Sequence, residues 1–142
     1  RGDKIRSYHV LCHLASRARV HLVAFADDAR DLTPDLISEP PDLIVCDASF
    51  IGLAKVLPAA LSLAPPGADM VTLVKPQFEA EGPEGVGKGG LVKDADQREA
   101  ALARVADWLA GSGWTAQASA ESPITGGDGN VEFLLWARRG GQ

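Results

Sequence analysis

Three charged residues lie at the ends of apolar segments that have the character of buried strands. Asp47 directly follows Leu43–Cys46, and Lys75 directly follows Met70–Val74. Glu132 stands at the head of a third apolar segment near the end of the chain. Ligands of open α/β sheets bind at the carboxyl ends of the strands. Two acids and a lysine that converge at one such edge would form a charge network of the kind found at functional sites.

Each of these three side chains also has a purely structural explanation. An aspartate after a strand often caps a helix or closes a turn, and a lysine at a strand end is often only solvated. Glu132 lies in an otherwise apolar segment, so it must be paired or face solvent to be tolerated. The positions alone therefore do not separate a catalytic cluster from three unrelated charged residues.

The segments around these residues alternate between strand and helix patterns. Helices are predicted for Ser7–Ala18, for Leu53–Leu63 with Pro58 as a kink or a late helix start, and from Asp94 to Gly111. Strands are predicted at Val20–Phe25, Leu43–Cys46, Met70–Val74, Trp114–Ala120 and Val131–Trp136. This alternation predicts an α/β fold with a mainly parallel sheet.

Composition adds detail to this arrangement. The fully apolar segment Leu43–Cys46 is predicted to be buried on both faces of the sheet. A glycine-rich turn, with no intervening helix, joins the last two strands and predicts an antiparallel hairpin at the sheet edge. Gln77–Val92 is predicted to be one long polar loop, and the tryptophans at 108, 114 and 136 are expected in the core.

The overall composition excludes several classes of protein. The 142 residues are 46% hydrophobic, as in a globular domain, and the net charge of −5 argues against nucleic-acid binding driven by bulk electrostatics. No apolar run has the length of a membrane span. Cys12 and Cys46 are too few for a disulfide scaffold, so both are expected to be reduced thiols of a cytoplasmic protein.

Two further motifs suggest chemistry that their context does not support. Residues 82–88, GPEGVGK, have the spacing of a phosphate-binding loop, but Gly89 stands where a magnesium-binding Ser or Thr is required. The segment also does not directly link a strand to an apolar helix, which argues against a nucleotide hydrolase. His9 and His13 lie one helical turn apart, but no cluster of carboxylates or cysteines completes a metal site.

A separate acidic cluster follows the predicted strand Val20–Phe25. Asp28 lies in this cluster, within the sequence DDARDL. Carboxylates just past a strand end can bind the ribose or adenine group of a nucleotide, and they are equally common as turn residues. Both interpretations of Asp28 stay open at this point.

Four segments together carry a family resemblance. They are DLIVCDASFIGL (42–53), LVKPQFE (73–79), VGKGGLVKD (86–94) and SPITGGDGNVEF (122–133). In order and spacing they resemble the hemolysin A (TlyA) type of FtsJ-like ribose 2′-O-methyltransferase over residues 20–139. The resemblance implies a Rossmann-like methyltransferase fold, S-adenosyl-L-methionine as methyl donor and a ribose hydroxyl of rRNA, typically of a cytidine, as acceptor.

The resemblance also assigns roles to individual residues. Such enzymes surround the acceptor hydroxyl with a Lys, Asp, Lys, Glu tetrad, whose last three members correspond to Asp47, Lys75 and Glu132. Asp28 falls where the family holds the adenine ring, so Asp28 and Asp47 are the expected cofactor contacts. We expect Lys75 mainly to orient the hydroxyl and to stabilise the developing alkoxide, and to act as a base only in the closed complex.

Other family features are absent from this sequence. The first tetrad lysine, the first strand with its glycine-rich loop and the amino-terminal S4-like RNA-binding domain normally precede the matching region. Residues 1–142 are therefore expected to be part of a methyltransferase domain, whose unpaired sheet edge could pair with another chain and which does not methylate RNA by itself. The alternative is a noncatalytic RNA- or protein-binding module that keeps the fold.

Overall fold

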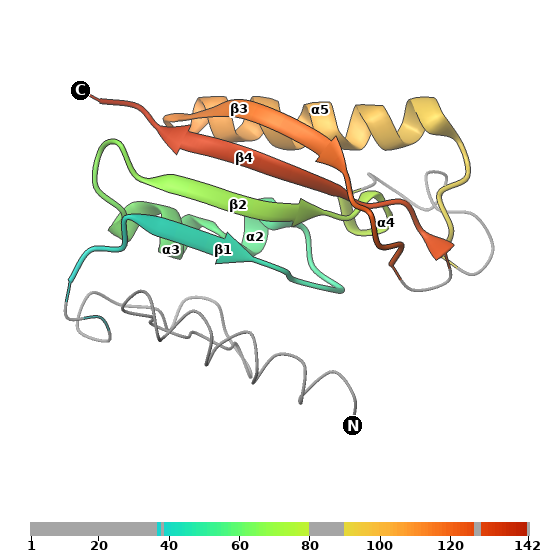
Figure 1. Ribbon diagram of the computed structural model, residues 1–142, viewed down its shortest axis with the longest axis horizontal. Helices are drawn as coiled ribbons and strands as arrows, with labels where there is room; N and C mark the ends of the chain where they lie inside the picture. The colour runs from blue at the N-terminus through green and yellow to red at the C-terminus, as the bar shows by residue number, and fades with distance from the viewer. Residues whose placement is uncertain (1–36, 38, 80–89, 127–128, 142) are drawn as a thin grey trace.

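The computed structural model describes residue 37 and residues 39–79, 90–126 and 129–141 (Figure 1). The strands in these ranges are β1 (Leu43–Cys46), β2 (Asp69–Val74), β3 (Trp114–Glu121) and β4 (Phe133–Arg139). The helices are α2 (Leu53–Val56), α3 (Pro58–Leu63), α4 (Pro76–Glu79) and α5 (Ala95–Gly111). The predicted helix 7–18 and strand 20–25 lie outside the described residues.

The strands form one mixed sheet in the order β1-β2-β4-β3. β1 and β2 are parallel, and β4 is antiparallel to both β2 and β3. The predicted antiparallel hairpin is present, and its second strand β4 lies between β2 and β3. The register opposes Val74 to Phe133. Lys75 follows Val74, and Glu132 precedes Phe133. The two charged residues therefore lie at the same end of the paired strands.

Local sequence signals explain where the helices begin. Pro58 starts α3, so the prediction of a late helix start is confirmed, and Leu57 separates this helix from α2. Asp94 caps α5 by accepting a hydrogen bond from Asp96 N at 2.9 Å. The prediction of an uninterrupted loop from Gln77 was wrong, because Pro76, whose missing N–H suits a first helical turn, begins α4.

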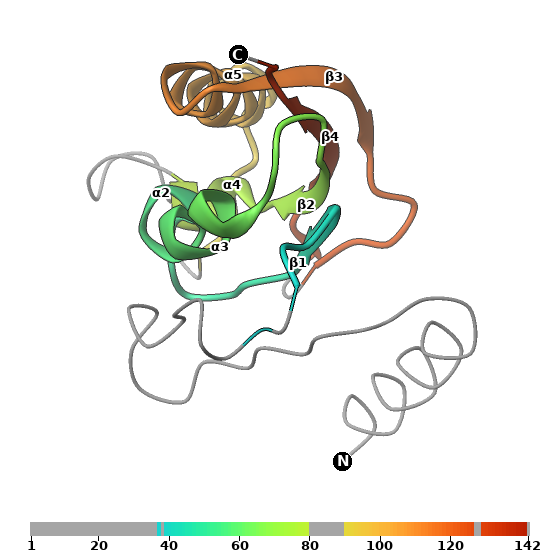
Figure 2. The ribbon, with the colours of Figure 1, turned by 90° about the vertical axis from the view of Figure 1, so that its left-hand side faces the viewer.

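The described helices lie on one face of the sheet, as Figure 2 shows. Under them lies the core, in which Met70 and Leu135 from the sheet and Leu109 from α5 are 0–2% exposed. Trp114 at the start of β3 is 1% exposed and joins the same cluster. Burial of each large side chain contributes about 1.5–3 kcal/mol, so this cluster fixes β2 and β4 under α5.

The opposite face of the sheet exposes several apolar side chains. Leu43 and Val45 of β1 are 53% and 67% exposed, whereas Ile44 is 8% exposed. The prediction that β1 is buried on both faces was therefore wrong in the described structure, where the helices cover one face only. Among the described residues, no helix combines the length and the apolar character needed to cross a membrane.

Trp136, predicted to be a core residue, also lies on this face and is 39% exposed. Its indole Nε1 donates a hydrogen bond to Asp69 Oδ1 at 2.8 Å. Arg138 forms an ion pair with the same carboxylate at 2.9 Å and stacks over the indole ring. The polar indole edge thus has a partner, which explains why a large aromatic residue is tolerated at the surface.

Candidate active site

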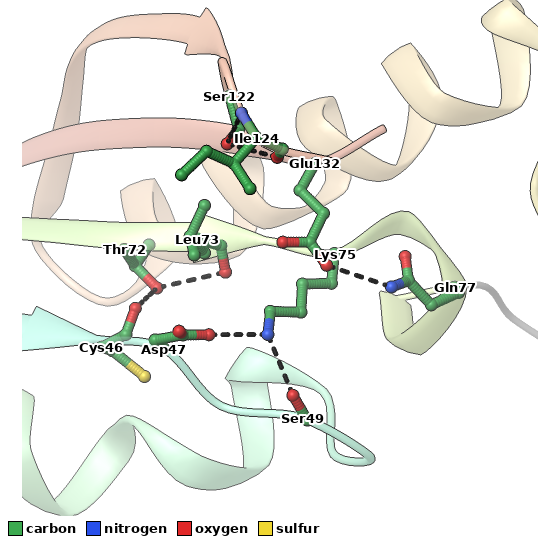
Figure 3. A network of polar contacts seen from close by, with 10 residues as sticks. All are labelled: Cys46, Asp47, Ser49, Thr72, Leu73, Lys75, Gln77, Ser122, Ile124 and Glu132. Carbon is green, nitrogen blue, oxygen red and sulfur yellow. Dashed lines mark hydrogen bonds and ion pairs between the residues drawn. The ribbon is translucent and has the colours of Figure 1, made fainter. Parts of the chain in front are cut away.

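Lys75 is the centre of a polar cluster at the carboxyl ends of β1 and β2 (Figure 3). Its Nζ lies 2.6 Å from Asp47 Oδ1 and donates a hydrogen bond to Ser49 Oγ at 2.9 Å. The Lys75 side chain is 11% exposed, whereas that of Asp47 is 65% exposed. The cluster therefore holds a nearly buried ammonium group whose carboxylate partner faces solvent.

Glu132 approaches the cluster from β4. The residue is 6% exposed, and its Oε1 accepts a hydrogen bond from Gln77 Nε2 at 3.3 Å. Figure 3 shows its carboxylate pointing toward the Lys75 side chain, although no ion pair joins these two groups in the described part of the chain. Gln77 Oε1 is buried and has no partner among the described residues, so its amide orientation is set by the Glu132 carboxylate.

The loop before β4 is built around Asn130. This residue is 3% exposed, and its amide accepts a hydrogen bond from Val92 N and donates one to Gly90 O, both at 3.0 Å. Its backbone carbonyl accepts a hydrogen bond from Gly126 N at 2.8 Å. Asn130 therefore ties the segment before α5 to the loop that carries Glu132, which fixes the entry of the carboxylate into the site.

Phe50 lies in the loop between β1 and α2, next to Ser49. Its φ angle of 65° is in the left-handed region, and the residue is 90% exposed. The ring contacts that of Phe78 in α4, with 5.1 Å between the centroids. A positive φ is unfavourable for a bulky residue, and an exposed ring gains little from burial. Phe50 is therefore a candidate for ligand contact.

Other kinds of chemistry have little support in the described residues. Burial raises the pKa of the Cys46 thiol, although Thr72 opposes this effect, so the thiol next to Asp47 stays protonated and is a poor nucleophile. In the described ranges, no group of three or more His, Cys, Asp or Glu residues is arranged to hold a metal ion. The His9 and His13 pair lies outside these ranges.

The arrangement suits chemistry at an oxygen atom. An ammonium group held by a carboxylate and a hydroxyl can donate a hydrogen bond to a hydroxyl group and can stabilise the negative charge that forms as this group loses its proton. The two acids, Asp47 and Glu132, can balance a positive charge nearby. The cluster can therefore hold an acceptor hydroxyl against a cationic reagent.

The structure brings together part of the predicted set of residues. Asp47 and Lys75 form an ion pair, and Glu132 reaches the same edge next to Gln77. Asp28 lies outside the described residues. The sequence interpretation did not single out four residues that the structure places around the cluster: Ser49, Phe50, Gln77 and Glu79. Their nearness in sequence to Asp47 and Lys75 was the available signal.

Known proteins match most of the chain. Residues 5–139 match the FtsJ-like methyltransferase family. The 16S/23S rRNA (cytidine-2′-O)-methyltransferase TlyA of Mycobacterium tuberculosis is 47% identical over 111 residues, which are 78% of this chain and 41% of that protein. YqxC of Bacillus subtilis, named as a candidate rRNA methyltransferase, is 46% identical over 107 residues, which are 75% of this chain and 38% of that protein.

A solved structure agrees with these matches. The crystal structure of a candidate hemolysin from Lactococcus lactis superposes with a TM-score of 0.77 at 30% identity, over 92% of this chain and 62% of that one. The chain spans about two fifths of the length of the two curated relatives, at 41% and 38%. The mixed sheet with its antiparallel final strand is the Rossmann-like fold of methyltransferases, and the chain belongs to the FtsJ-like methyltransferase family.

Proposed function

We propose that this chain is the carboxyl-terminal part of the catalytic domain of an rRNA methyltransferase. The enzyme transfers a methyl group from S-adenosyl-L-methionine to the ribose 2′-hydroxyl of a cytidine. The name of the mycobacterial relative gives the cytidine 2′-O position for that protein. The observation that carries the proposal is the nearly buried Lys75, held by Asp47 and Ser49 beside Glu132 in a chain of this family.

The residues present are compatible with the cofactor. Asp47 and Glu132 supply two carboxylates at one sheet edge, and Asp47 is 65% exposed and so accessible to a ligand. Carboxylates suit a cofactor that carries a positive sulfonium and an amino group. When bound, S-adenosyl-L-methionine supplies an activated methyl group on its sulfur atom. Asp47, and Asp28 outside the described residues, are the cofactor contacts in this proposal.

The protein's own residues then align the acceptor and handle its charge. Asp47 and Ser49 hold Lys75 Nζ, which leaves one ammonium N–H to donate a hydrogen bond to the 2′-oxygen. The proton of the 2′-hydroxyl passes to water while the ammonium group stabilises the negative charge on the oxygen, or, in the closed complex, it passes to a neutral Lys75 amine, which becomes the ammonium group. Glu132, which accepts a hydrogen bond from Gln77, supplies a second carboxylate that points toward the lysine side chain (Figure 3).

The exposed Phe50 ring supports an RNA acceptor. Enzymes that modify a nucleotide take it out of the helical stack, and an unstacked base gains binding energy on an aromatic ring. Phe50 lies next to Ser49, whose hydroxyl contacts Lys75, so a base on the ring would bring its ribose close to the lysine. An rRNA acceptor would place the reaction in the cytoplasm.

The test measures methyl transfer to ribosomal subunits by the full-length protein. Asp47→Asn, Lys75→Met and Glu132→Gln should each lower kcat by about 10²–10⁴-fold, the usual effect of a positioned acid or base. Lys93→Met, at an exposed lysine, is the matched control and should leave kcat unchanged. Full activity in the Lys75→Arg variant would exclude the role of Lys75 as a base.

Cofactor binding separates the remaining outcomes. Calorimetry should detect S-adenosyl-L-methionine binding to the full-length wild type. Binding together with normal methyl transfer by all three site variants would contradict the assignment of the catalytic residues. A wild type that neither binds the cofactor nor methylates RNA would instead identify a noncatalytic binding module.

A further inference from the structure

Helix α2 receives its cap from a distant part of the chain. Its N-cap residue is Gly52, which has no side chain to accept a hydrogen bond from the first helical turn. Glu79 Oε1, at the end of α4, accepts this bond from Leu53 N at 2.8 Å, across 26 residues of sequence. A cap of this kind joins the loop after β1 to the end of α4.

The two segments also touch along their backbones. A Cβ atom added to Gly52 would lie 3.3 Å from Phe78 O and 3.4 Å from Glu79 Oε2. The loop after β1 therefore passes directly against α4, as only glycine permits without a shift of the neighbouring atoms. The contact between the Phe50 and Phe78 rings lies along the same seam.

The loop between Asp47 and Leu53 is thus fastened at both ends to the segment Lys75–Glu79. At its start, Asp47 and Ser49 contact Lys75 Nζ at 2.6 and 2.9 Å. At its end, Leu53 N binds Glu79. The ammonium group of Lys75 can hold its position only while the loop that carries its two partners stays close to α4.

Glu79 is itself held from the other side. Arg104 of α5 donates a hydrogen bond to the Glu79 backbone carbonyl at 3.2 Å. Burial raises the pKa of the Glu79 carboxyl, and the charge of Arg104 partly opposes this effect. The Glu79 side chain is half-buried, so a carboxylate at this place is costly unless it has such partners. Glu79 therefore has a structural role and does not serve only to keep the protein soluble.

We propose that Glu79 is a positioning residue of the methyl-transfer site, which fixes the Asp47–Gly52 loop against Lys75 by capping α2 through the Leu53 amide. This inference rests on the proposed function of Lys75, but its structural part does not depend on catalysis. Glu79 contacts neither substrate nor cofactor and acts through the loop alone.

The experiment compares Glu79→Ala, which removes the acceptor, with Glu79→Gln, which keeps an oxygen that can accept from Leu53 N. Hydrogen exchange of the Leu53 amide should be about tenfold faster in the alanine variant and close to wild type in the glutamine variant. Acylation of the Lys75 amine, followed by mass spectrometry, should rise in the alanine variant and return to the wild-type level in the glutamine variant. Glu99→Ala, an exposed glutamate on α5, is the matched control.

The catalytic readout uses the full-length protein. Glu79→Ala should lower kcat about tenfold and should also raise the KM for S-adenosyl-L-methionine, because the loosened loop carries the proposed cofactor contact Asp47, and Glu79→Gln should restore both. If the alanine variant fails to fold, Gly52→Ala provides a second route, because it pushes the loop away from Phe78 O without removing a charge.

Three results would overturn the inference: rapid exchange of the Leu53 amide in the wild type, unchanged Lys75 acylation once this amide is exposed, or an unchanged kcat in both the Glu79→Ala and Gly52→Ala variants. Failure of the proposed function is recognised separately, because the wild type would then lack methyl transfer while Leu53 exchange and Lys75 acylation still report the fastening.

Discussion

Gly126 packs directly against the carboxylate of Glu132. A Cβ atom added to Gly126 would lie 2.7 Å from Glu132 Cδ and would overlap with its Oε1. The contact is with the far end of a flexible side chain, so an added methyl group would displace the carboxylate and would leave the backbone in place. The glycine therefore determines where this acid can stand.

Gly126→Ala should displace the Glu132 carboxylate without removing it, so the variant tests whether the position of this group matters for activity. We expect the variant to fold with a free energy of unfolding close to that of the wild type, while kcat for methyl transfer falls about tenfold or more as the carboxylate moves from its place. Gly111→Ala is the matched control, because its Cβ would meet nothing within 4 Å at the end of α5. Equal kcat values in the two variants would argue against a catalytic role for Glu132.

Removal of Asp47 should lower the free energy of unfolding more than removal of Lys75, although the two residues form one ion pair. Asp47→Ala leaves a nearly buried ammonium group with Ser49 as its remaining partner, and it should cost about 1–3 kcal/mol of unfolding free energy. Lys75→Met leaves a carboxylate that is 65% exposed and replaces the buried charge by an apolar group, so it should cost less than about 1 kcal/mol. Urea unfolding of both variants measures the difference, and a larger loss for Lys75→Met would contradict it.

Phe50 should reduce stability and increase RNA affinity. Phe50→Gly removes the strain of the 65° φ angle and should raise the free energy of unfolding by about 1 kcal/mol. The same variant should weaken RNA binding by about 1–3 kcal/mol, the usual contribution of one base stacked on an aromatic ring. Phe50→Ala should weaken RNA binding equally without the gain in stability. Unchanged RNA affinity in both variants would exclude the stacking role.

Two carboxylates should give opposite dependences of stability on pH. Burial raises the pKa of Glu79 above its usual 4.5, although Leu53 N and Arg104 oppose this shift. The stability gained from protonated Glu79 is therefore fully present below about pH 4.5 and is lost as the pH rises through the pKa in the folded state. Urea unfolding across that pH range measures this loss, and the urea midpoint of the Glu79→Gln variant should not show it.

Asp69 provides the contrasting case. Hydrogen bonds from Arg138 and Trp136 hold the pKa of this carboxyl below its usual 3.8. Its contribution is present above about pH 3.8 and is lost as the pH falls through the pKa in the folded state. Asp69→Asn should therefore reduce the loss of stability as the pH falls below about 3.8. It should leave unchanged the loss that Glu79 causes as the pH rises. A single variant that changes both pH dependences would contradict these assignments.

Local signals were sufficient for most of the described elements. The apolar runs at Leu43–Cys46 and Met70–Val74 predicted β1 and β2, because a short run of branched residues has few ways to be buried other than as a strand. Asp94 predicted the start of α5, since an N-cap acts on the backbone two residues away. The antiparallel hairpin of β3 and β4 followed from the glycine-rich turn between them.

The sequence also determined the family, because the four matching segments keep their order and spacing along the chain. It predicted that Asp47, Lys75 and Glu132 lie at strand ends, which depends only on where each apolar run stops. Their chemical roles stay proposals that the variants above test.

Only the tertiary structure decided how these elements meet. The insertion of β4 between β2 and β3, which brings Glu132 to the edge that carries Lys75, depends on strand pairing between residues far apart in sequence. The cap of Leu53 by Glu79 and the exposure of Val45 likewise depend on what packs against each segment. Residue spacing encodes contacts within a helix or a strand, but burial and long-range hydrogen bonds are settled by the whole chain at once, and these set the geometry of the site.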